Sequence, residues 1–231
     1  MKQMWILGDS ILRGVVWSQE TKRYMTSTSI GLEELAGKYD LAIDNRSRFG
    51  YTIDKGEAVM HKKLAGGEAC DVALIEYGGN DSDFDWVAIS NAPHAPHFPK
   101  TSLSTYESTY HHMIKELKAH GTKPLLCNLV PVCSSLYLDW ISRDGLSREN
   151  ILSWLGDEEH IFRYQAQYSR MAEDIAREEG CMLVNLRQAF LSHSHMESLF
   201  CPDGIHPNER GQKIISSVLG QALQNLHLAT G

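Results

Sequence analysis

The sequence lacks the features that mark disulfide-rich, membrane-spanning and secreted proteins. Its 231 residues contain five cysteines, an odd number without any CxxC spacing, so neither a disulfide framework nor a zinc knuckle is expected. No apolar stretch reaches the roughly 18 residues that a transmembrane helix needs. The first apolar run, Met4–Leu7, is too short for the core of a signal peptide. These absences predict a cytoplasmic protein with reduced thiols.

The sequence also lacks a basic cluster and a flexible linker. The formal net charge is −7, and lysine and arginine are scattered without forming a basic stripe. Nucleic acid is therefore not an expected partner, and electrostatic repulsion disfavours anionic membrane surfaces. No Pro/Gly/Ser-rich linker, repeat or low-complexity tract divides the chain. Since 42% of the residues are hydrophobic, residues 1–231 are predicted to form a single domain with one substantial core.

Short apolar runs alternate with longer amphipathic segments along the chain. The short runs are apolar throughout, which is typical of parallel strands covered on both faces. Predicted strands are Met4–Leu7, Asp40–Asp44, Asp71–Tyr77, Pro124–Val130 and Cys181–Leu186. Predicted helices are Ile53–Leu64, Ser104–His120, Glu158–Glu179 and Asn208–Leu226. This alternation predicts an α/β fold, a flavodoxin-like three-layer αβα sandwich around five parallel strands, with chemistry at their carboxyl ends.

Three short motifs fall where such chemistry is expected. Gly8-Asp9-Ser10 follows the first strand, and Gly78-Gly79-Asn80-Asp81 follows the third. Asp203-Gly204-Ile205-His206-Pro207 precedes the last helix, and its carboxylate can fold back onto its imidazole across one turn. Taken singly, each motif favours an ordinary turn. Taken together, they supply a hydroxyl, an amide donor and a carboxylate-oriented base to one edge of the sheet, the combination used in nucleophilic catalysis.

The order and spacing of these motifs resemble those of the SGNH hydrolase (GDSL-like) family over nearly the whole chain. The resemblance implies that Ser10 is the nucleophile, with Asp203 and His206 completing a triad. It also implies an oxyanion hole made by the Ser10 and Gly50 N–H groups and the Asn80 side chain. Candidate substrate contacts beside these residues are Asp9, Tyr51 and Phe84.

The implied activity is hydrolysis of a carboxylic ester through an acyl-enzyme, without a metal or organic cofactor. The segments 81–100 and 131–156 are rich in polar residues and proline. They predict a compact pocket for short-chain acyl (acetyl) esters of a small alcohol or carbohydrate. The alternative is an apolar lid assembled from the aliphatic residues of the second segment, which are Leu136, Leu138, Ile141, Leu152 and Leu155. An O-acyltransferase, a lysophospholipase or a thioesterase using the same triad is the alternative, as is a non-enzymatic flavodoxin-like binding module.

Several histidines and aromatic residues suggest other ligands. His94 and His97 have a spacing that metal ligands can adopt, although an irregular Pro-rich loop is the favoured interpretation. His111 and His112 are adjacent on a predicted helix and so cannot share one face, which argues against joint metal binding. Aromatic residues after the fourth strand could stack on sugar rings, though packing is the commoner role; they are Tyr137, Trp140 and Trp154.

Overall fold

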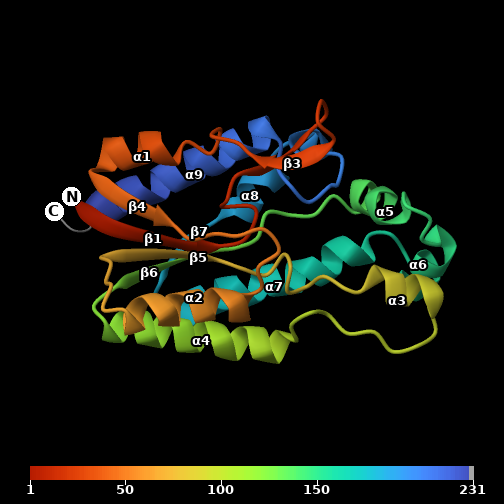
Figure 1. Cartoon of the computed structure of the whole chain (residues 1–231), viewed down its shortest axis with the longest axis horizontal. Coiled ribbons are helices and arrows are strands. Elements are labelled where there is room, and N and C mark those ends of the chain that lie inside the picture. The colour runs from red at the N-terminus through yellow and green to blue at the C-terminus, as the bar shows by residue number, and fades with distance from the viewer. Residues whose placement is uncertain (229–231) are drawn as a thin grey trace.

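The computed structural model describes residues 1–228, with side chains through residue 226. Its main sheet has five parallel strands in the order β4-β1-β5-β6-β7 (Figure 1). These strands are β1 (Lys2–Gly8), β4 (Leu41–Asn45), β5 (Val72–Glu76), β6 (Lys123–Cys127) and β7 (Met182–Val184). The predicted α/β class and five-stranded parallel sheet are confirmed, and β1 lies centrally, beside β5.

Helices cover both faces of the sheet (Figure 1). One face packs against α1 (Leu32–Tyr39), α8 (Leu186–Leu191) and α9 (Glu209–Leu228), and the other against α2 (Ile53–Ala65), α4 (Leu103–Ala119) and α7 (His160–Glu178). The alternation of side chains along β1 connects the two layers. Met4 and Ile6 join the first core cluster, whereas Trp5 and Leu7 join the second. Because both faces are buried, the strand is apolar throughout, as the sequence predicted.

Local capping explains where several helices begin or end. Ser102 accepts a hydrogen bond from the Thr105 N–H at the start of α4, and Gly121 follows its end with a φ of 77°. Asn185 caps α8 by accepting from the Gln188 N–H at 3.0 Å. The prediction that the fifth strand reaches Leu186 is therefore wrong, since β7 ends at Val184 and the chain turns into a helix.

The structure also contains elements that the sequence did not predict. A two-stranded antiparallel hairpin, β2 (Val15–Ser18) and β3 (Arg23–Thr26), follows the first strand of the main sheet. Three short helices also form: α3 (Trp86–Asn91) within the Pro-rich segment expected to be irregular, and α5 (Ser134–Ser142) and α6 (Arg148–Leu155) after the fourth strand of the sheet. A 3-10 turn, η1, spans Met196–Leu199. The helices α3, α5 and α6 share a third hydrophobic cluster, separate from the two beside the sheet.

Two further findings bear on the expected class of protein. All five cysteines are free thiols, and Cys70, Cys127, Cys133 and Cys201 are buried. Within residues 1–228, no helix is both long and apolar enough to cross a membrane.

Candidate active site

Ser10 lies at the carboxyl end of β1, where the chain leaves the sheet in an Asx turn. The Asp9 Oδ1 accepts a hydrogen bond from the Ile11 N–H at 2.8 Å, and the Ser10 carbonyl accepts from the Val15 N–H at 3.0 Å. These contacts hold the backbone on both sides of Ser10. The turn predicted for this motif is therefore present, and it presents the Ser10 side chain to a cavity above the sheet edge.

Asp203, His206 and Ser10 form a continuous chain of hydrogen bonds. His206 Nδ1 lies 2.6 Å from Asp203 Oδ2, and His206 Nε2 lies 2.9 Å from Ser10 Oγ. The other oxygen of Asp203 accepts from the backbone N–H groups of Ile205 and His206, both at 3.0 Å. The predicted fold-back of the carboxylate onto the imidazole is confirmed. A carboxylate on Nδ1 favours the tautomer that leaves Nε2 free to accept the Ser10 proton.

Gly204 permits the loop that carries this pair to pack closely against α5. Its φ is 70°, and a Cβ there would lie 2.6 Å from the Cys133 carbonyl oxygen and 2.7 Å from the Tyr137 backbone nitrogen. The Cys133 N–H donates to the Gly204 carbonyl at 2.8 Å. Glycine is therefore required both for the backbone conformation and for the contact.

Tyr24 of the hairpin is a third partner of Asp203. Its hydroxyl donates to Asp203 Oδ2 at 2.6 Å, and its ring lies 4.9 Å from the His206 ring, centroid to centroid. Burial raises the pKa of Asp203, but the hydrogen bonds from His206 and Tyr24 outweigh it, so the net pKa lies below the ordinary value. Asp203 is thus held as a carboxylate, the form that stabilises an imidazolium.

Asn80 follows β5 and points into the same cavity. Its Nδ2 donates to Asp9 Oδ2 at 3.0 Å, which determines which end of the amide is the donor. Because an amide nitrogen carries two hydrogens, a second N–H remains for another acceptor. The turn is compact at Gly78, where φ is 136° and a Cβ would lie 2.8 Å from the Tyr106 hydroxyl.

Gly50 lies on the cavity wall with a φ of 71°, just before α2. The first turn of α2 is tied to the Asn80 loop, because Asp81 Oδ1 accepts from the Ile53 N–H at 3.0 Å. Asp81 is fully buried, and this burial raises its pKa to about 6. The loops that carry Gly50 and Asn80 are therefore joined behind the cavity.

A buried carboxyl pair lies beneath the floor of the cavity. Glu76, the last residue of β5, is 1% exposed and Asp9 is 2% exposed. Burial raises the pKa of Glu76 well above its ordinary value, and the neighbouring Asp9 carboxylate raises it further. Burial raises the pKa of Asp9 as well, so ionising both carboxyls together is disfavoured, and Asp9 Oδ2 accepts from Asn80 at 3.0 Å.

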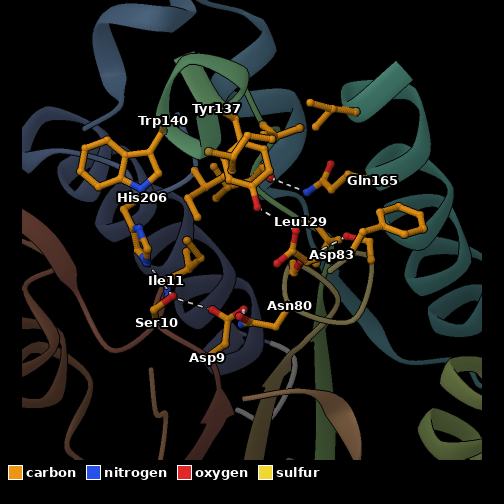
Figure 2. A pocket seen from close by; sticks show the side chains of 18 of the residues that line it. Asp9, Ser10, Ile11, Asn80, Asp83, Leu129, Tyr137, Trp140, Gln165 and His206 are labelled. Carbon is orange, nitrogen blue, oxygen red and sulfur yellow. Dashed lines mark hydrogen bonds between the residues drawn. The ribbon is translucent and has the colours of Figure 1, made fainter. Parts of the chain in front are cut away.

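The cavity has a volume of about 470 Å³, within the range of small-molecule sites. Figure 2 shows Trp140 beside His206 on one side and Asp83, Leu129 and Gln165 on the other. Phe49, 55% exposed, stacks on the His206 ring at 5.5 Å. The deeper wall is mainly apolar and aromatic; it includes Leu129, Val130, Val132, Tyr137, Ile141, Leu155, Ile161 and Tyr164. The segments predicted to form a polar wall thus turn apolar side chains inward.

The three residues expected to contact substrate lie in different places. Phe84 lines the cavity and packs on Trp86. Asp9 also borders the cavity, but its oxygens accept hydrogen bonds from Asn80 and Ile11. Its role is therefore to hold the Asn80 side chain and the Ser10 turn in place. Tyr51 differs from the prediction, because it packs against the core cluster beneath the sheet and does not line the cavity.

The histidines of the two motifs have different partners. His97 Nε2 lies 2.8 Å from the Ala92 carbonyl oxygen in the segment after α3. His111 and His112 diverge, since His111 Nδ1 lies 2.8 Å from Glu179 Oε1 whereas His112 Nδ1 lies 2.6 Å from Glu57 Oε1. Tyr137 and Trp140 line the cavity, and Trp154 packs on Phe84.

Sequence reasoning missed two side chains that support the site. Tyr24 lies in an unpredicted hairpin, although the β-rich runs Val15–Ser18 and Arg23–Thr26 around a polar turn are a hairpin signal. Glu76 had a clearer signal: it is a carboxyl within the apolar run of the third predicted strand, where a charge is costly.

Comparisons with known proteins agree with this fold. The model of the GDSL-like lipase/acylhydrolase family matches residues 6–214. No curated protein sequence matches the chain. Among solved structures, a lipase/acylhydrolase from Enterococcus faecalis is similar at 14% identity and a TM-score of 0.66, covering 98% of this chain and 97% of that one.

Two further structures have comparable similarity. An acetyl xylan esterase from Geobacillus stearothermophilus is 17% identical with a TM-score of 0.66, covering 96% of this chain and 94% of its own. An α/β hydrolase enzyme from the metagenome of Lake Arreo, Spain, is 19% identical with a TM-score of 0.64, covering 97% and 96%. At these identities the structures establish the shared fold, and the family model extends over most of the sequence. The chain therefore belongs to the GDSL-like lipase/acylhydrolase family and is a carboxylic ester hydrolase.

Proposed function

We propose that the protein is a serine esterase in which Ser10 forms an acyl-enzyme. The observation that carries this proposal is the hydrogen-bond chain from Asp203 through His206 to Ser10, at 2.6 and 2.9 Å. His206 accepts the Ser10 proton as the Oγ attacks the ester carbonyl, then donates that proton to the departing alcohol. Water enters next, gives its proton to His206 and releases the acid, which restores Ser10.

The tetrahedral oxyanion is stabilised by three donors in this proposal: the Ser10 N–H, the Gly50 N–H and the Asn80 amide. Asn80 is the best supported of the three, because Asp9 accepts one of its hydrogens and leaves the other for substrate. A donor fixed before the reaction is worth about 3–4 kcal/mol at the transition state.

The position of His206 determines where the alcohol and acyl portions of the ester lie in the cavity. The leaving oxygen must be next to His206 Nε2 to receive its proton, so the alcohol portion lies beneath Phe49 and Trp140. The acyl portion then extends to the opposite side, toward Leu129 and Gln165 (Figure 2). The cavity as a whole has a volume of about 470 Å³ and many apolar lining residues, which is more room than an acetyl group needs. We therefore infer acyl groups somewhat longer than the acetyl expected from sequence, of about four to eight carbons.

An acetylated carbohydrate is the second candidate substrate. The aromatic residues at the cavity entrance favour it: Phe49 is exposed and Trp140 half-buried, and aromatic faces suit sugar rings. The similar structure from Geobacillus stearothermophilus is an acetyl xylan esterase. Acetylated xylooligosaccharides compared with p-nitrophenyl hexanoate at equal concentration would distinguish the two substrates.

The nucleophile is tested by Ser10→Ala together with covalent labelling by an organophosphonate. Loss of a triad nucleophile costs about 10⁶ in kcat in a serine protease, so hydrolysis should fall to the background level. The label should attach to Ser10 in the unaltered protein and be absent from the variant. Retention of a tenth of the rate, with an unchanged circular dichroism spectrum, would refute the acyl-enzyme mechanism. If the protein were instead a binding module without a reactive serine, the organophosphonate would not label it.

A further inference from the structure

A second cluster of potential ligands lies on the opposite helical layer, between α2 and α4. Glu57 and His61 are four residues apart on α2, and His112 and Glu116 are four residues apart on α4. Residues at this spacing share one helix face, so each helix offers one imidazole and one carboxylate to the other. Figure 1 shows the two helices side by side beneath the sheet. None of the four residues lines the Ser10 cavity.

The four side chains already converge. His61 Nε2 lies 2.8 Å from Glu116 Oε2, and His112 Nδ1 lies 2.6 Å from Glu57 Oε1. His112 Nε2 is 3.7 Å from Glu116 Oε1, and the two imidazole rings meet edge to face at 5.5 Å between centroids. One ligand atom each from Glu57, His61 and His112 can be chosen within 4.8 Å of one another. Ligands of a tetrahedral zinc ion, at about 2.0–2.2 Å from the metal, are separated by about 3.3–3.6 Å, so modest side-chain rotations would suffice.

One atom of the cluster has no satisfactory partner. His61 Nε2 is shielded from solvent and makes no well-aligned hydrogen bond among the described residues, although Glu116 is close. A shielded nitrogen without a hydrogen-bond partner is uncommon, because its desolvation is uncompensated. A cation between the two helices would take its lone pair.

We propose that Glu57, His61, His112 and Glu116 bind a divalent transition-metal cation, Zn²⁺ in particular. Two imidazoles and two carboxylates form a neutral complex with a doubly charged ion, and imidazole ligands favour zinc over magnesium or calcium. The ion joins α2 to α4 and has no part in ester hydrolysis. Because α2 begins at Ile53, directly after the Gly50 loop, this link stabilises the layer that supports that loop.

Zinc titration of the full-length protein, followed by calorimetry, tests the proposal. We expect one saturable site per chain and an increase in the unfolding midpoint with zinc. His61→Ala and His112→Ala should each weaken binding at least tenfold and abolish the increase. His111→Ala is the matched control, because His111 is on the same helix but faces Glu179; this variant should bind zinc within twofold of the unaltered protein.

The outcomes separate the metal site from the ester chemistry. Chelation should leave p-nitrophenyl ester hydrolysis unchanged, while the unfolding midpoint falls to that of the zinc-free protein. No saturable binding, or equal weakening by His111→Ala and His112→Ala, would overturn the site. Binding that survives both His61→Ala and His112→Ala would place the metal elsewhere, for example on the free thiols, and would overturn it too.

Discussion

Replacing Glu76 by glutamine should change how the stability of the protein depends on pH. Glu76 is 1% exposed beside Asp9, and its pKa in the folded protein is raised well above 4.5 by burial and then by that neighbour. In the unfolded chain the same carboxyl ionises near its ordinary pKa. The folded protein therefore holds a proton that the unfolded chain releases, so the free energy of unfolding falls as pH rises above about 4.5.

The change in the free energy of unfolding can be calculated from the single proton that Glu76 holds in the folded protein. Where Glu76 is protonated in the folded state and ionised in the unfolded state, the free energy of unfolding falls by about 1.4 kcal/mol per pH unit. Glutamine keeps an N–H donor for Asp9 and does not titrate. Between about pH 5 and pH 7, Glu76→Gln should therefore gain about 1–3 kcal/mol of stability relative to the unaltered protein.

Urea denaturation of both proteins across this pH range measures the difference. Contributions from other groups, such as Asp81 and Asp203, cancel because both proteins contain them. Parallel stability curves would show that Glu76 is ionised in the folded protein and would refute the reasoning. Glu76→Leu is the comparison variant: it removes one polar partner of the buried Asp9, which still accepts from Asn80 and Ile11, and should destabilise the protein by about 1–3 kcal/mol.

Three further predictions concern activity. Asn80→Ala should lower kcat about 10²–10³-fold with little change in KM, since the amide binds the oxyanion more tightly than the ground-state carbonyl; a raised KM with unchanged kcat would contradict the assignment. Tyr24→Phe removes a 2.6 Å hydrogen bond to Asp203 and should lower kcat about 10- to 100-fold, because bonds to charged groups are worth about 1.5–3 kcal/mol. An unchanged kcat would mean that the remaining hydrogen bonds of Asp203 suffice to hold it. Across p-nitrophenyl esters, kcat/KM should rise about fourfold per added CH₂ from acetate to hexanoate, because each buried CH₂ contributes about 0.8 kcal/mol. A maximum at acetate would instead support the acetyl ester expected from sequence.

The parts of the molecule that depend on local sequence were predictable. The run Met4–Leu7 is apolar on both faces because β1 is covered by two helical layers, so its pattern specifies a central strand. The contact between Asp203 and His206 spans three residues, and one turn is enough to form it.

The parts that depend on distant pairing were not predictable. Tyr24 reaches Asp203 across 179 positions, and no spacing rule connects them. The apolar character of the cavity wall was also not evident from the segments that form it. The segments 81–100 and 131–156 are polar on average, but α5 and α6 place Ile141 and Leu155 on the cavity wall. Average composition does not show which face of a short helix is buried.

The separate hydrophobic cluster shared by α3, α5 and α6 has a consequence for how this enzyme changes over evolutionary time. Ser10 and Asn80 follow strands of the main sheet and His206 precedes α9. Part of the cavity wall instead belongs to this third cluster, which includes Trp86, Tyr137 and Leu155. A region with its own small core can open, and its amide hydrogens can exchange with solvent, without unfolding the whole domain. Substitutions within it are therefore expected to reshape which esters are accepted while leaving the reaction itself intact. Selectivity can then drift across descendants, or be redesigned in the laboratory, at little risk to the sheet.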